Sequence, residues 1–186
     1  MRRLFALAAA ILATATIASG CGSHTATAAP AAKVPLDIVP PTLPGPAGDP
    51  PMTLAEYKQG AERLDAAGGR SVIADGRVFE IRRGTTLVGA LQVSTLIPRI
   101  DVSSPKQRDH LANLMVSGSV QKVSVSGVEV VVAKTTDKLV FVWFGDHLFE
   151  VLQIKGIGID PPTILKGIID FQRPTGRLRI GPGASK

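Results

Sequence analysis

The segment LVFVWF, residues Leu139–Phe144, decides the fold of this chain of 186 residues. Polar and apolar residues alternate along an antiparallel strand that has one face in water, yet all six residues here are apolar. Gly145-Asp146 then forms a tight turn into a second apolar segment, Leu148–Ile154. The sequence therefore predicts a central hairpin whose second face is also covered by something.

The residues around this hairpin predict two more strands and two helices. The strands are Val120–Val125 and Val128–Lys134, joined by the turn Ser126-Gly127. A helix is expected to start at the N-cap Ser104, with Pro105 at its first position. Gln107 is expected to complete a capping box with Ser104, and Gly118 to end the helix. The predicted apolar stripe consists of Leu111, Leu114 and Met115. The last helix should begin at Asp160-Pro161 and carry Ile164, Leu165, Ile168, Ile169 and Phe171.

The N-terminal part of the domain is predicted as one helix and three strands. Thr53-Leu54-Ala55-Glu56 matches a capping box, and a helical stripe of Leu54, Tyr57, Ala61 and Leu64 leads to Gly68-Gly69. Asp75-Gly76 suits a type I′ hairpin turn between Ser71–Ala74 and Arg77–Ile81. Arg83-Gly84 then turns the chain into a strand over Thr85–Leu96. Its apolar face should hold Leu87, Leu91, Val93 and Ile97, and its wet face Thr86, Gln92 and Ser94.

These elements give the order α-βββ-α-ββββ-α and the fold class α+β, a mainly antiparallel sheet of about seven strands packed with three helices. A single domain is expected over residues 53–172 and a disordered tail over 173–186. Residues 21–52 are rich in proline and predict an extended tether that could hold the domain up to roughly 90 Å from an anchor. The alternative is that Val34–Val39 packs along the domain as an arm.

The N-terminus reads as an export signal over residues 1–20. Arg2 and Arg3 precede the uncharged apolar stretch Leu4–Ala18, which is shorter than the roughly 20 residues of a spanning helix. Ala18-Ser19-Gly20-Cys21 resembles the lipobox of bacterial lipoproteins, although that family mostly has Leu where this chain has Ala18. The resemblance implies cleavage before Cys21, a diacylglyceryl group on its thiol, and a lipid-anchored protein at the cell membrane, facing outside the cytoplasm.

Two alternatives remain at this end of the chain. An ordinary secretory signal could be cleaved near Ala13-Thr14-Ala15, which would leave Cys21 without lipid. Arg2-Arg3-Leu4-Phe5 also resembles the core of a twin-arginine signal, but the flanking residues of that motif are missing, so general secretion is favoured over twin-arginine export. The chain has one cysteine, which excludes an intramolecular disulfide.

The charge balance and the absence of known sequence motifs limit the classes of partner and of chemistry that we expect. The net charge is +6, and without Arg2 and Arg3 the 19 remaining basic residues against 15 acidic ones give +4. This surplus suits anionic lipids or wall polymers, but the basic residues are dispersed and aromatics are few, so no nucleic acid is expected. The histidines His24, His110 and His147 lack metal-ligand spacing, and we expect no metal, cofactor or catalytic residue.

The apolar hairpin suggests either of two environments. It is a central hairpin covered on both sides, or it borders an apolar cavity lined by Phe141, Trp143, Phe149 and Leu152 that receives a lipid-like ligand or a partner protein. The order of a strand with Trp143, a turn, a strand and a helix resembles exported lipoprotein carriers and envelope-stress sensor domains, which wrap a half-open sheet around apolar ligands. That resemblance assigns no site residue.

The expected function is therefore a lipid-anchored envelope protein with a non-catalytic domain that binds an apolar ligand or a partner protein. One alternative is an anchored hydrolase acting on envelope material through scattered carboxylates such as Glu80, Asp101, Glu129 and Glu150. Another is a structural accessory subunit of an envelope complex.

Replacing Cys21 tests the anchor. We expect the Cys21→Ala variant to lose covalent lipid and to leave the membrane fraction, because two acyl chains on one sulfur suffice for stable anchoring. The measurements are incorporation of labelled fatty acid and membrane fractionation, with Ser23→Ala as the matched control. Labelling and membrane attachment equal to those of the wild type would show that the lipobox interpretation is wrong.

Overall fold

Strand β7 (Lys138–Phe144) is buried on both faces in the computed structural model, which describes residues 33–46, 48–57, 72–116, 119–155 and 159–180. Phe141 and Trp143 belong to a core cluster on one face of the sheet. Val140, Val142 and Phe144 belong to a second cluster on the other face. The hairpin of β7 with β8 (Leu148–Lys155) is therefore covered on both sides, as the first of the two interpretations proposed.

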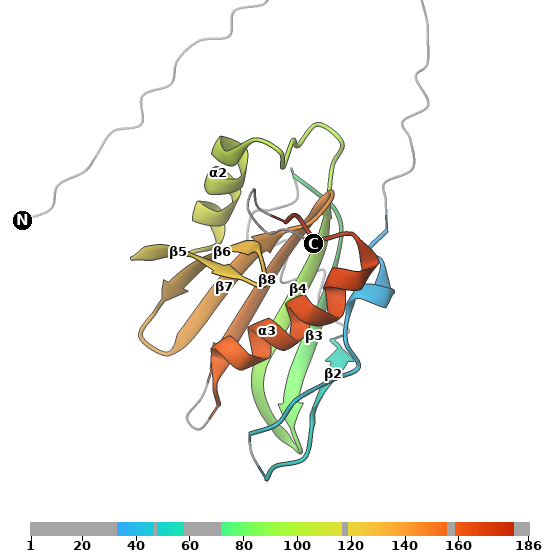
Figure 1. The fold of residues 1–186 in the computed structure, drawn as a ribbon, viewed down its shortest axis with the longest axis vertical. Helices are drawn as coiled ribbons and strands as arrows, with labels where there is room; N and C mark the ends of the chain where they lie inside the picture. Colours follow the sequence, from blue (N-terminus) through green and yellow to red (C-terminus); the bar gives the residue numbers. More distant parts are fainter. Residues whose placement is uncertain (1–32, 47, 58–71, 117–118, 156–158, 181–186) are drawn as a thin grey trace, which may run out of the picture. The chain divides into compact units, whose positions relative to one another are not determined.

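The described strands form one antiparallel sheet in the order β1-β2-β3-β4-β8-β7-β6-β5 (Figure 1). The other strands are β1 (Thr42–Leu43), β2 (Met52–Glu56), β3 (Ile73–Arg83), β4 (Thr86–Leu96), β5 (Val120–Val125) and β6 (Val128–Lys134). The consecutive hairpins of β5 to β8 confirm the predicted meander, and Ser126 and Gly127 turn with positive φ values of 48° and 83°. Strand β4 pairs with β8 at the centre of the sheet, and the chain crosses from β4 to β5 at the far edge.

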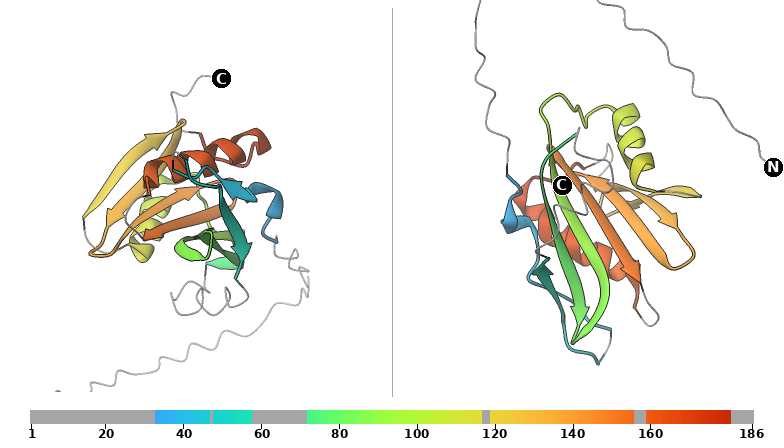
Figure 2. Two further views of the ribbon diagram at one scale, coloured as in Figure 1. Left: turned by 90° about the horizontal axis from the view of Figure 1, so that it is seen from below. Right: turned by 180° about the vertical axis from the view of Figure 1, so that it is seen from behind.

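Two α-helices cover opposite faces of this sheet (Figure 2). Helix α3 (Pro161–Gln172) buries Ile164, Leu165, Ile168 and Ile169 against Trp143, Leu152 and their neighbours. Helix α2 (Pro105–Met115) buries Leu111 and Ala112 against the opposite cluster, which contains Val142 and Phe149. The described residues thus form a mainly antiparallel α+β structure with eight strands and two α-helices, instead of the predicted seven and three.

The described residues from Val34 to Met52 contribute to the core, so the predicted start of the domain at residue 53 is too late. Ile38, Leu43 and Met52 are nearly inaccessible to solvent, and Val34 is also buried. The 3₁₀ turn η1 (Leu36–Ile38) and strand β1 form an arm beside β2, and the Val34 N–H donates to Asp75 Oδ2 at 2.9 Å. The segment thus packs along the domain as an arm, which was the alternative to an extended tether. The apolar residues between its prolines explain this packing.

The helix predicted from Thr53 is wrong where the structure describes it. Met52–Glu56 is strand β2, paired with β3 through Thr53↔Arg82 and Glu56↔Phe79. Burial of Met52 and partial burial of Leu54, with Thr53 exposed between them, follow the period of a strand. Backbone pairing of β2 with β1 and β3 therefore outweighs the local capping pattern. The remainder of that helix, over residues 58–69, lies outside the described residues.

The hairpin predicted at Asp75-Gly76 is also wrong. Strand β3 runs through both residues, and its pairing with β4 contains an irregularity between Ile73 and Asp75. The carboxylate of Asp75 is used by the arm, through the Val34 N–H, and not by a turn. The chain reverses instead at the predicted Arg83-Gly84, where Gly84 has a φ of 59°.

Helix ends and the C-terminus differ from expectation in smaller ways. Ser104 and Pro105 start α2 as predicted, but Gln107 Oε1 accepts from the Asp101 N–H at 2.8 Å and closes no capping box. The predicted stripe residues Leu114 and Phe171 are exposed. The predicted disordered tail is structured to residue 180, with the turn η3 (Arg173–Thr175) and two single bridges, Val128↔Ile180 and Gly145↔Leu178. No described helix is long and apolar enough to cross a membrane.

Truncating a buried arm residue tests whether the arm belongs to the fold. Ile38 is 1% exposed, and we expect Ile38→Ala to lower the free energy of unfolding by about 2–5 kcal/mol. Leu36 lies in the same turn at 54% exposure, so Leu36→Ala should change stability by less than about 0.5 kcal/mol. Urea unfolding measures both values. Equal, small effects would mean that the arm does not contribute to the core.

Candidate ligand-binding site

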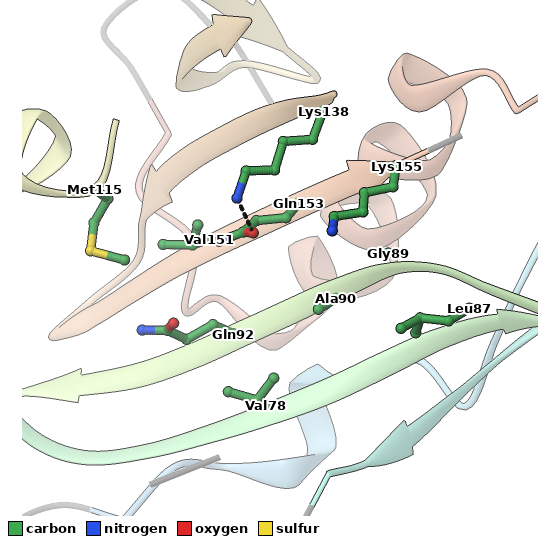
Figure 3. A pocket seen from close by; sticks show the side chains of 10 residues that line it. All are labelled: Val78, Leu87, Gly89, Ala90, Gln92, Met115, Lys138, Val151, Gln153 and Lys155. Carbon is green, nitrogen blue, oxygen red and sulfur yellow. Dashed lines mark hydrogen bonds between the residues drawn. The ribbon is translucent and has the colours of Figure 1, made fainter. Parts of the chain in front are cut away.

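A hollow of about 350 Å³ lies on the α2 side of the sheet, over β3, β4 and β8 (Figure 3). Helix α2 covers the residues of β7 and the adjoining parts of β6 and β8, such as Val142 and Val131, and leaves this part of the face open. The hollow is lined by Val78, Leu87, Gly89, Ala90, Gln92, Met115, Lys138, Val151, Gln153 and Lys155. Small and branched apolar residues therefore form most of its floor, and longer polar side chains border it.

An irregular pairing of β3 with β4 brings Leu87 into the hollow. Ile81 pairs with Gly89, but the next residue, Arg82, pairs with Leu87, so Val88 is an extra residue on β4. Val88 packs into the core on the α3 side, and Leu87 lines the hollow at 47% exposure. The prediction that Leu87 shares a face with Leu91 and Val93 is thus wrong, because it assumed unbroken alternation.

Close contact of β4 with β8 closes the floor beneath the hollow. A Cβ atom on Gly89 would lie 2.5 Å from the Gln153 carbonyl oxygen and 2.8 Å from Ile154 Cδ1. Only glycine fits this approach without a shift of the β8 backbone. The two strands therefore remain paired below the cavity, where Ala90 lies opposite Gln153.

Lysine ammonium groups and amides form the polar border. Lys138 and Lys155 are directly opposite each other in the pairing of β7 with β8. Lys138 Nζ donates to Gln153 Oε1 at 3.0 Å, and Lys155 Nζ lies 3.8 Å from Asp137 Oδ2. On β4, Gln92 Nε2 donates to Ser94 Oγ at 3.3 Å. Such a border can bind polar or anionic groups beside an apolar floor.

The four predicted lining residues lie elsewhere. Phe141, Trp143 and Leu152 are buried in the cluster beneath α3. Phe149 points to the other face, where its ring meets that of Phe144 with centroids 5.4 Å apart. All four serve as core and line neither of the two cavities described here. The alternation of Val151, Gln153 and Lys155 along β8 indicates a second, partly polar face and could have predicted this lining. The prediction relied on the aromatic residues instead.

The described histidines and the acids considered for a hydrolase are placed as follows in the structure. His110 is exposed on α2, and His147 is exposed in a turn with its Nε2 3.8 Å from Asp146 Oδ1. His24 lies outside the described residues. Among the residues that the structure describes, no three His, Cys, Asp or Glu side chains are grouped as they would be around a metal ion.

Of the acids considered for a hydrolase, three are used in local contacts. Glu80 Oε2 accepts from the Arg82 guanidinium at 2.7 Å, and Glu129 lies 3.6 Å from Arg108. Hydrogen bonds from the Ser103 hydroxyl and backbone N–H hold the pKa of Asp101 below its ordinary value. Glu80 is thus paired with a guanidinium on β3, whereas Glu129 and Asp101 both interact with Arg108 beside the N-terminus of α2.

A second cavity of about 380 Å³ borders the N-terminus of α2. Its lining includes Ser103, Pro105, Arg108, Glu129, Phe144, Arg179 and Ile180. Arg108 Nη1 already donates to the carbonyl oxygens of Val102 and Ser103, at 2.9 and 3.1 Å, and Nη2 faces Glu129. Because this guanidinium is occupied by the protein itself, we assign no ligand to this cavity.

Glu150, the fourth acid, is fully buried beneath α3. Gln172 Nε2 donates to its Oε2 at 2.6 Å, and Trp143 Nε1 donates to Gln172 Oε1 at 3.3 Å. Glu150 Oε1 has no hydrogen-bond partner among the described residues. Desolvation raises the pKa of this carboxyl to about 8, against the opposing effect of the Gln172 bond, so Glu150 is mostly neutral at pH 7.

No protein-family model, no curated protein and no solved structure matches this chain. The side chains and cavities of the chain itself are therefore the basis for its proposed function.

Glu150 should make stability depend on pH. The folded state keeps the proton up to about pH 8, whereas an unfolded glutamate releases it near its ordinary pKa of 4.5. The contribution of protonated Glu150 to the free energy of unfolding is therefore fully present below pH 4.5. It declines toward pH 8 by up to about 1.4 kcal/mol per pH unit. We expect Glu150→Gln to remove this decline, as measured by urea unfolding at pH 5 and pH 8.

Glu129→Gln is the matched control, because it removes an exposed carboxylate on the same sheet. If both variants change the pH dependence equally, or neither does, the assignment of a buried proton to Glu150 is wrong.

Proposed function

We propose that this chain is a lipid-anchored extracytoplasmic envelope protein whose α+β domain binds an apolar ligand without catalysis. The hollow beside α2 is the binding site in this proposal. The single observation that carries it is a cavity of about 350 Å³ with an apolar floor on a sheet face that α2 leaves open. That volume lies at the lower end of the roughly 300–1,000 Å³ range of small-molecule sites.

The chemistry of the lining favours binding over hydrolysis. Its described members carry alkyl, thioether, amide and ammonium groups, and no carboxylate, histidine or cysteine is among them. A hydrolase acting through paired carboxylates needs two of them beside one substrate position. Glu150, the most perturbed carboxyl, lies under α3 on the other face of the sheet.

The concave shape favours a small ligand over the accessory-subunit alternative. A protein partner of ordinary size buries about 800 Å² on each side, and such surfaces are broad. Leu87, Val78 and Val151 instead converge on one depression, in which a compact apolar group would exchange water for alkyl contacts.

Attachment at the membrane is a separate part of the proposal. It is supported by the resemblance of Ala18-Ser19-Gly20-Cys21 to a lipobox and by the export-like residues before it. A protein held beside a bilayer through Cys21 would meet apolar molecules at high local concentration.

Filling the hollow tests the binding proposal. Ala90 lies on its floor, and we expect Ala90→Leu to weaken binding of a neutral naphthylamine dye to the full chain at least about tenfold, because the side chain occupies the ligand volume. Fluorescence titration measures the affinity, and native mass spectrometry of protein from its own envelope detects carried ligand.

Ser124→Leu is the control, since it adds the same side chain at an exposed position of the edge strand β5. Absence of dye binding to the wild type, together with absence of co-purified ligand, would overturn the proposal. Equal loss of binding in both variants would also count against this hollow.

A further inference from the structure

The two lysines at the hollow form an unfavourable pair within the protein. Lys138 and Lys155 occupy directly opposite positions on β7 and β8, where Cβ atoms are about 4.5–5.5 Å apart. Like charges in such positions destabilise a sheet. Both residues line the same cavity, so their charges act on its interior and its mouth.

Their contacts within the protein leave most of this charge uncompensated. Lys138 donates to an amide oxygen of Gln153, which is neutral. Lys155 faces Asp137 at 3.8 Å, but both side chains are 63% exposed, and exposed pairs of this kind contribute little. The Thr135 hydroxyl also donates to Asp137 Oδ1 at 3.1 Å and holds that carboxylate in the β6–β7 turn.

The apolar and charged parts of the lining occupy different regions. Figure 3 shows Lys138 and Lys155 beside β8, with Gln153 between them, while Val78 lies across the hollow on β3 and Met115, at the end of α2, lies at one end of the hollow. Ala90 and Val151 form the floor between these regions. A molecule that fits this arrangement has one apolar body and one acidic end.

We infer that the hollow takes a single-chain amphipathic anion, with its alkyl part on Ala90 and Val151 and its carboxylate or phosphate between Lys138 and Lys155. This inference rests on the proposed function and adds the class of ligand. An anionic head would replace repulsion between two ammonium groups by two attractive, charge-assisted contacts. The small volume suits one short chain.

Competition among four ten-carbon amphiphiles tests the inference on the full chain. Decanoate, decyl phosphate, decanol and decyltrimethylammonium would each displace the neutral naphthylamine dye at low salt. We expect at least one anion to compete about tenfold better than decanol, which corresponds to about 1.4 kcal/mol. The cation should compete less well than decanol, and added salt should reduce the preference for the anion. The better of the two anions identifies the head group.

Removal of both lysine charges tests the residues. In Lys138→Gln/Lys155→Gln, we expect the roughly tenfold preference for the anion over decanol to disappear, measured as the ratio of the two affinities within the same variant. The variant should unfold at or above the wild-type temperature, because repulsion across the strands is lost. Lys166→Gln on α3 is the control and should keep the preference for the anion.

The outcomes separate this inference from the proposal on which it rests. Equal competition by anions and decanol, or an anion preference that survives in the double variant, would overturn the lysine assignment while leaving apolar binding intact. Failure of the dye and of every amphiphile to bind would overturn both.

Discussion

The need to bury β7 and β8 on both faces governs the rest of this structure. Each strand places large apolar side chains on alternate sides, so each face of the sheet requires its own covering layer. Helix α3 and the N-terminal arm cover one face, and α2 covers the other. One helix of 11 residues cannot extend over an eight-stranded sheet, and the hollow begins where α2 stops.

The two faces consequently have different physical characters. On the α3 side, the bonds from Trp143 through Gln172 to Glu150 connect β7, the end of α3 and β8 inside an apolar cluster. A neutral carboxyl costs far less to bury than a carboxylate, which explains how this polar group is retained there. The α2 side keeps two lysine side chains, on directly opposite strand positions, at the edge of an open cavity. The buried hydrogen-bonded network and the open cavity thus lie on opposite faces of the sheet.

Local patterns predicted the C-terminal half of the fold well. Strands β5 and β6 begin and end where their alternation and turns indicated, because each pairs with its neighbour in sequence. The errors arose where distant segments decide the outcome. Met52–Glu56 becomes a strand through pairing with β3, and Asp75 stays within β3 while it binds the arm. The candidate site was missed in part for the same reason: the alternation of Val151, Gln153 and Lys155 is present in the sequence, but the extra residue Val88 and the pairing of β4 with β8 appear only in the structure.

The packed arm also limits the length of the tether if the protein is anchored through Cys21. Because Val34 is already part of the core, the chain between Cys21 and Lys33 spans at most about 40 Å when fully extended, less than half of the reach expected for a tether to residue 52. A domain on so short a tether would stay within about 40 Å of the bilayer that holds its anchor. If the proposed function holds, ligand exchange with that bilayer would need only short movements of the domain.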